Sequence, residues 1–169
     1  EIGWCDWSSD VCSSDLVIRA CQQLGWPLDI MGDGPDREQL EKLAGDSTRL
    51  LGYVSDEARA AAIQQADLFI FTAHEDFGVA PVEALAAGLP VVAYQAGGAL
   101  DYISPGKNGW FFAEQTVESL VATLQTLPGQ QISPRAIATS AKPFAEPAFT
   151  AAIKKIVTNE RRGAHAHRH

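Results

Sequence analysis

The sequence has no long apolar run, since no stretch approaches the ~20 consecutive apolar residues that a helix needs to cross a bilayer. It has no excess of positive charge either: 13 Lys and Arg stand against 21 Asp and Glu, a formal net charge of −8. Such an acidic chain argues against nucleic acid or an anionic membrane surface as a partner. We therefore expect no membrane span and no nucleic-acid ligand.

Cysteine is scarce as well. Cys5, Cys12 and Cys21 are too few and too clustered for a disulfide framework, and they lack the spacing of zinc ligands. We therefore expect a cytoplasmic protein without a bound metal. The dinucleotide fingerprint G-x-G-x-x-G is also missing, because Gly32 and Gly34 supply its first two glycines but Arg37 occupies the third position. This departure argues against a dinucleotide-dependent enzyme or epimerase.

Short apolar segments alternate with amphipathic ones along most of the chain, and 46% of its residues are hydrophobic. The apolar segments predict strands at residues 26–31, 49–52, 67–72, 89–94 and 110–112. Helical periodicity and end signals predict helices at residues 16–24, 36–44, 57–65, 80–87, 99–103, 116–127, 133–140 and 144–157. Together they predict one α/β domain: a Rossmann-like, doubly wound parallel sheet that binds its ligand at the carboxyl ends of the strands.

The two ends of the chain do not follow this pattern. Residues 1–14 hold two of the four tryptophans and two of the three cysteines, without a helical or strand period. We interpret them as a non-native leader that has replaced the first strand, which would leave a neighbouring strand unpaired. The polar residues 159–169 predict a disordered tail. Residues 15–158 are then the domain itself.

The most informative stretch is residues 72–96, which predicts a strand, a loop and a helix. Unpaired amides at residues 77–80, where the helix begins, suit a phosphate. Glu75 in the loop and Glu83 in the helix would repel a phosphate, so they suit neutral hydroxyl groups, such as those of a sugar or a ribose. This combination predicts a nucleotide-sugar as the ligand.

Glu75 and Glu83 stand in an E-x7-E spacing, and this stretch resembles the retaining glycosyltransferases of the GT-B fold, family four, above all the bacterial mannosyltransferases of surface-polysaccharide assembly. Supporting matches are M-G-D-G-P-D-R-E-Q-L from Met31, L-G-Y-V-S-D-E from Leu51 and G-G-A-L-D-Y-I from Gly97. The resemblance covers roughly residues 15–150. It implies the C-terminal, donor-binding half of a GT-B fold.

The resemblance implies a role for each matching residue. Glu75 would be the catalytic residue that holds the sugar hydroxyls, and Glu83 would hold the ribose diol. Asp56 would accept hydrogen bonds from guanine, which favours a GDP-sugar over a UDP-sugar, or it is merely a first-turn helix charge. The choice of GDP-mannose among the GDP-sugars follows from the family resemblance alone. The remaining donor-binding candidates are Gly32 and Gly34 (alternatively only a tight turn), Tyr53 and Val54 at the base, Phe77, Gly78 and Val79 at the sugar and phosphate, and Gly97 and Gly98 (alternatively only a flexible link).

Two departures from the family limit what this chain is expected to do. The Arg and Lys that grip the donor pyrophosphate are missing before residue 15, and so is the N-terminal acceptor domain. We therefore expect little transferase activity from the chain alone, although its parent enzyme would work in the cytoplasm at the inner face of the membrane. The absence of a D-x-D motif is consistent with catalysis without a metal or another cofactor. The alternative is a non-catalytic nucleotide-sugar binding module.

Overall fold

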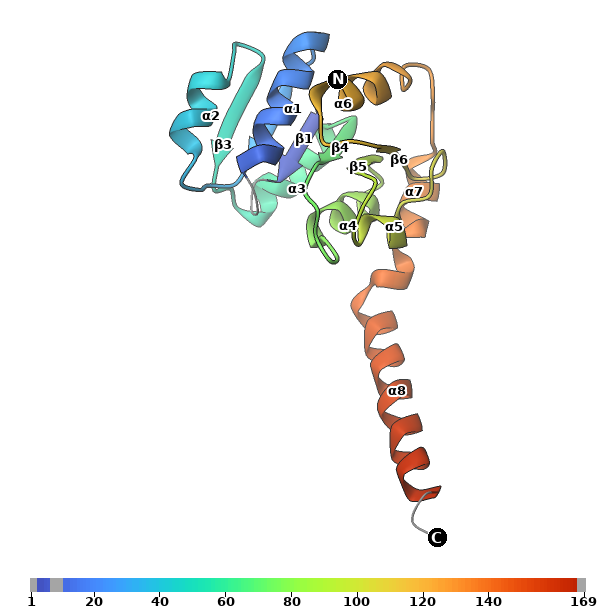
Figure 1. The fold of residues 1–169 in the computed structure, drawn as a ribbon. Coiled ribbons are helices and arrows are strands. Elements are labelled where there is room, and N and C mark those ends of the chain that lie inside the picture. Colours follow the sequence, from blue (N-terminus) through green and yellow to red (C-terminus); the bar gives the residue numbers. More distant parts are fainter. Residues whose placement is uncertain (1–2, 7–10, 167–169) are drawn as a thin grey trace.

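The computed structural model describes residues 3–6 and 11–166 (Figure 1), and the side chains of residues 14–158. Its centre is a six-stranded, wholly parallel sheet in the order β3-β2-β1-β4-β5-β6. The strands are β1 (Gly3–Asp6), β2 (Leu28–Met31), β3 (Thr48–Gly52), β4 (Leu68–Phe71), β5 (Val91–Tyr94) and β6 (Gly109–Phe112). The strand order reverses between β1 and β4, so the predicted doubly wound parallel sheet is confirmed.

Helices cover both faces of the sheet. They are α1 (Val11–Leu24), α2 (Arg37–Leu43), α3 (Asp56–Gln65), α4 (Val79–Ala86), α5 (Ala99–Tyr102), α6 (Val117–Gln125), α7 (Pro134–Ser140), the 3-10 helix η1 (Lys142–Phe144) and α8 (Glu146–Ala166). One core cluster joins the sheet to α1, α2 and α6, and a second joins it to α3, α4, α5 and α7. In β4, Leu68 and Ile70 belong to the first cluster and Phe69 and Phe71 to the second. This double burial explains why the strands read as continuous apolar runs.

The amino end corrects the interpretation of residues 1–14 as lying outside the fold. Gly3–Asp6 form β1 in the middle of the sheet, where Gly3 pairs with Leu28 of β2 and with Leu68 of β4. No neighbouring strand is therefore left unpaired at this place, contrary to our expectation. The sequence did not predict this strand because a short central strand of a parallel sheet needs no alternating pattern. Whether residues 1–14 are native to the gene stays a prediction.

The carboxyl end differs too. The last helix, α8, extends through Ala166, where the sequence predicted a disordered tail from Asn159. Its apolar residues Phe149, Ile153, Ile156 and Val157 are exposed, and α8 projects away from the sheet in Figure 1. Within the part of the chain that the structure describes, no helix is both long and apolar enough to cross a bilayer.

Cys21 on α1 is fully buried, and this burial raises the pKa of its thiol to about 12. Because only the thiolate is a nucleophile, we expect Cys21 to resist alkylation by iodoacetamide at mildly alkaline pH and to react once guanidinium chloride unfolds the chain. Peptide mapping by mass spectrometry would measure this. Rapid labelling of Cys21 in the folded protein would contradict the packing of α1 on the sheet.

Candidate functional site

The carboxyl edge of the sheet carries every residue predicted for the site. The loop after β2 carries Gly32 and Gly34; the segment after β3 carries Tyr53, Val54 and Asp56; the loop after β4 and the helix α4 carry Glu75, Phe77, Gly78, Val79 and Glu83; and the loop after β5 carries Gly97 and Gly98. In open α/β sheets, ligands bind at this edge where the strand order reverses. Here that point lies between β1 and β4, directly beside Glu75.

The loops after β4 and β5 are locked together at Glu75. The backbone N–H of Gly98 donates to the backbone oxygen of Glu75 over 2.8 Å, and the Gln115 side chain donates to the backbone oxygen of Thr72 over 2.8 Å. A Cβ at Gly97 would overlap the Glu75 carbonyl, and one at Gly98 would lie 2.6 Å from the Phe77 Cα. Gly97 and Gly98 are thus more than a flexible link, because they let the β5 loop approach the protein's own β4 loop.

The first turn of α4 presents its unpaired amides to this site. Gly78 precedes the helix with a φ of +76°, and a Cβ there would lie 3.0 Å from the Tyr102 hydroxyl and 3.1 Å from Phe71 Cζ. Only glycine fits this backbone and this space. Val79 begins the helix and is exposed. A helix N-terminus with accessible amides favours an anionic group.

An aromatic cluster packs around Phe77 in the loop after β4. The ring of Phe77 packs on Tyr102 and on Phe144, at centroid distances of 5.9 and 6.0 Å. Burial, and then the negative charges of Glu75 and Asp101, raise the pKa of Tyr102, so its phenol stays protonated. The Tyr102 hydroxyl is buried and has no hydrogen-bond partner among the described residues. Tyr102 therefore acts as an apolar support for Phe77.

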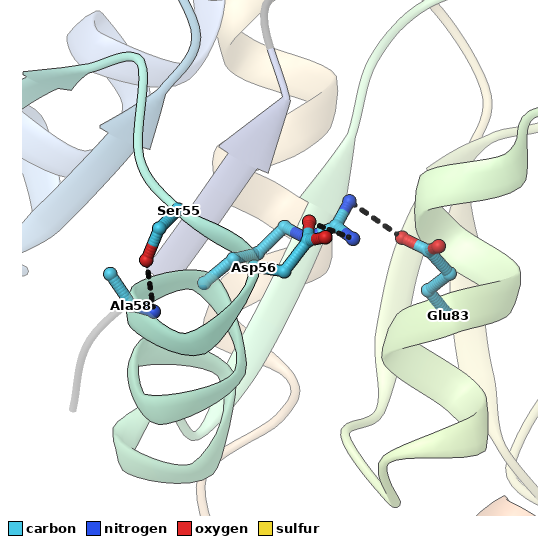
Figure 2. A network of polar contacts seen from close by, with 5 residues as sticks. Ser55, Asp56, Ala58 and Glu83 are labelled. Carbon is cyan, nitrogen blue, oxygen red and sulfur yellow. Dashed lines mark hydrogen bonds and ion pairs between the residues drawn. The ribbon is translucent and has the colours of Figure 1, made fainter.

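Glu83 lies on the second turn of α4, opposite α3. Its carboxylate binds the Arg59 guanidinium over 3.0 Å, and the same guanidinium binds Asp56 over 3.2 Å. Figure 2 shows Glu83 and Asp56 on the two facing helices, with Ser55 accepting a hydrogen bond from the N–H of Ala58 and so capping α3. The sequence did not single out Arg59. Its spacing from Asp56 was visible, but its contact with Glu83, 24 residues further on, was not.

The loops after β2 and β3 form the other side of the edge. The N–H of Gly32, at a φ of +118°, donates to the backbone oxygen of Gly52 over 2.9 Å, and the N–H of Gly34 donates to Asp33 over 3.0 Å. These contacts are those of a tight turn and do not by themselves indicate a ligand. Gly52 was not among the residues predicted for the site. A Cβ there would lie 2.8 Å from a side-chain nitrogen of Arg37.

Tyr53 and Val54 follow β3 with different exposures. The Tyr53 ring is 89% exposed, whereas Val54 packs partly against the core. Asp56 is exposed at the start of α3, which suits both a ligand contact and a first-turn helix charge. The ring of Tyr53 is thus available for stacking on a planar ligand.

A cavity of about 550 Å³ lies elsewhere, at the opposite, amino edge of the strands. Its lining includes Trp26, Asp67, Pro90, Trp110 and Gln130, and none of the residues predicted for the site. We place the site at the carboxyl edge because the backbone amides, the two glutamates and the reversal of strand order meet there. Among the residues with a described placement, no group of three or more His, Cys, Asp or Glu residues could hold a metal ion.

Known proteins resemble this chain in sequence and in structure. It is 38% identical over 102 residues to a sulfoquinovosyl transferase of Arabidopsis thaliana (57% of this chain, 20% of that protein), and 37% identical over 81 residues to a GDP-mannose-dependent alpha-mannosyltransferase of Mycolicibacterium smegmatis (47% and 21%). The chain thus spans about a fifth of the length of these curated relatives.

Two solved structures share the fold over nearly the whole chain. The structure of Anabaena HepE in complex with UDP-glucose matches with a TM-score of 0.74 at 22% identity, covering 96% of this chain and 48% of that one. Sucrose-phosphate synthase from Thermosynechococcus elongatus matches with a TM-score of 0.80 at 19% identity, covering 96% and 46%. The family described as glycosyl transferases group 1 matches residues 13–144. The chain therefore belongs to the glycosyl transferases group 1 family.

Proposed function

We propose that the chain is the C-terminal, donor-binding half of a retaining family-four glycosyltransferase of the GT-B fold, with GDP-mannose as its donor. The observation that carries this proposal is the β4–α4 unit, which places the Glu75 loop, the first turn of α4 and Glu83 together beside the reversal of strand order. Two relatives named as GDP-mannose-dependent mannosyltransferases and the HepE structure with UDP-glucose support a nucleotide-sugar ligand.

In this proposal, the amides at the start of α4 bind the diphosphate and stabilise its charge as the sugar leaves. The half-buried Glu75 holds the sugar hydroxyls and positions the reacting carbon, and Glu83 accepts hydrogen bonds from the ribose diol. The exposed ring of Tyr53 lies where the base would stack. The reaction needs no metal in this scheme, since the partial positive charge of the amides stabilises the negative charge of the leaving diphosphate.

The parent enzyme would complete this cleft with an acceptor domain and work in the cytoplasm, at the inner face of the membrane. The isolated 169-residue chain would bind its donor and transfer little sugar. A non-catalytic nucleotide-sugar binding module would bind in the same way, so an activity assay of a parent enzyme that includes the acceptor domain separates the two functions.

We expect Glu83→Ala to weaken nucleotide binding at least ~10-fold, because losing hydrogen bonds to a charged group costs about 1.5–3 kcal/mol. Calorimetric titration of the chain with GDP, GDP-mannose, UDP and UDP-glucose would measure this and identify the base. Glu38→Ala is the matched control, because Glu38 pairs with Lys42 on the exposed face of α2. The proposal fails if none of the four ligands binds the folded chain, or if both variants bind alike.

A further inference from the structure

Arg59 joins the two helices that border the site. It lies on the first turns of α3, and its guanidinium contacts Asp56 on its own helix and Glu83 on α4. The side chains of Arg59 and Glu83 are 38% and 41% exposed, so the pair lies at the surface of the site, whereas the Asp56 side chain is 91% exposed. An ion pair this exposed adds little to stability, typically about 0–1 kcal/mol. Arg59 lies between Asp56 and Glu83, two residues that are candidates for binding the nucleotide-sugar, and this position indicates a role in ligand binding.

Phosphate binding by Arg59 does not fit this arrangement. One guanidinium and two carboxylates carry a net charge of −1, and a diphosphate that approached Arg59 would face both Asp56 and Glu83. The start of α4, where no side chain caps the helix and Val79 is exposed, offers a phosphate backbone amides at a distance from the Arg59 cluster. Arg59 is therefore placed to hold the two carboxylates rather than the diphosphate.

The contacts leave both carboxylates free to bind a ligand. Arg59 bonds one oxygen of Glu83 (Oε2) and one of Asp56 (Oδ1), and a carboxylate accepts about four hydrogen bonds in all. The guanidinium is planar and permanently charged, and its two terminal nitrogens each bind one of these carboxylates. The two carboxylates are therefore held close together, on either side of the guanidinium. A ligand that suits these two carboxylates donates hydrogen bonds from hydroxyl groups to Glu83 and from N–H groups to Asp56.

We propose that Arg59 is a positioning residue for the nucleoside end of the donor. It orients Glu83 toward the ribose diol and Asp56 toward the N–H edge of the base, and so favours guanine, whose neighbouring N1–H and N2–H2 groups match a carboxylate. Uracil offers a carboxylate only one N–H, and the carbonyl oxygens on both sides of that N–H repel the carboxylate. This inference rests on the proposed function.

The test compares the wild-type chain with Arg59→Gln, which keeps a polar hydrogen-bond donor but removes the charge and shortens the side chain by two bonds. The ligands are GDP, 2′-deoxy-GDP, UDP and inorganic pyrophosphate. We expect Arg59→Gln to weaken GDP binding roughly 5- to 30-fold, the factor that corresponds to about 1–2 kcal/mol. We also expect it to lose most of the preference for GDP over both 2′-deoxy-GDP and UDP, while pyrophosphate binding stays unchanged.

Two further variants sharpen the result. Arg59→Lys should restore only part of the preference, because an ammonium lacks the planar fork that binds two carboxylates at once. Arg19→Gln is the control, since Arg19 forms a similarly exposed ion pair with Asp15 on α1, and neither residue belongs to the proposed site. Thermal unfolding verifies that each variant is folded.

The outcomes separate the inference from the function on which it rests. Binding that is sensitive to Glu83→Ala but unchanged by Arg59→Gln overturns the role of Arg59 and leaves the donor site intact. An equal loss of GDP and pyrophosphate binding also overturns it, because Arg59 would then be a phosphate ligand. Absence of nucleotide binding to the wild-type chain overturns both proposals.

Discussion

Gly98→Ala is expected to abolish nucleotide binding. Gly98 has an ordinary helical φ of −63°, so alanine fits its backbone, and the effect comes from crowding alone. The new Cβ would lie 2.6 Å from the Phe77 Cα and would overlap the Asp76 carbonyl oxygen. These are backbone atoms that cannot rotate away, so the loop that carries Glu75 must shift. A misplacement of about 1 Å costs on the order of 100-fold in rate at a catalytic site, and we expect a loss of similar size in nucleotide affinity here.

Calorimetric titration and urea unfolding of Gly98→Ala would measure both consequences. We expect the free energy of unfolding to fall by about 1–3 kcal/mol, as in overpacked cores. Gly129→Ala is the matched control, because its φ of +88° strains alanine by about 1–2 kcal/mol while nothing lies within contact of the added Cβ. Similar losses of stability with binding retained only in Gly129→Ala would support the close approach of the two loops. Normal binding by Gly98→Ala would contradict it.

Asn108→Ala is expected to cause a large loss of stability, about 3–5 kcal/mol of the free energy of unfolding. The Asn108 side chain is buried and donates to the Tyr102 backbone oxygen and to the Ser140 hydroxyl, each over 2.8 Å, while it accepts from the Ser104 N–H over 2.7 Å. Alanine would leave the backbone oxygen of the buried Tyr102 without this donor and the Ser104 N–H without this acceptor. It would also release α7 from the start of β6.

Urea unfolding followed by circular dichroism would measure the loss. Ser140→Ala is the graded control, because it removes one of the three partners and should cost about 1 kcal/mol. If the two variants lost equal stability, the contacts of Asn108 with Tyr102 and Ser104 would contribute nothing. A loss below that of Ser140→Ala would refute the prediction.

The elements that the sequence predicted well are those whose signals are local. The strands at β2, β3, β4, β5 and β6 and the helices between them lie within a few residues of their expected bounds, because apolar periodicity, caps and turn glycines act over short stretches. The cap at Ser55 is one example, since it depends on Ala58 three residues later. The two ends of the chain lacked such signals, and β1 and the length of α8 were mispredicted there.

The sequence predicted which residues lie at the candidate site, but it did not predict which of their atoms contact one another. The sequence pointed to Glu75 and Glu83 through their spacing around a helix start, and both lie at the expected edge of the sheet. It gave no role to Asn108, which is buried and makes three side-chain hydrogen bonds. It offered two interpretations of Gly97 and Gly98, donor binding or a flexible link, and the structure shows that both also contact the protein's own backbone closely.

The sequence by itself therefore determined the class of fold and predicted the edge of the sheet and the residues that we propose for ligand binding, because each follows from patterns within single strand-loop-helix units. Only the tertiary structure decided that residues 3–6 complete the sheet, that Gly98 holds the Glu75 loop and that Arg59 joins Asp56 to Glu83. The physical reason is that each of these contacts joins segments far apart in the chain, and no local pattern encodes which distant atoms will meet.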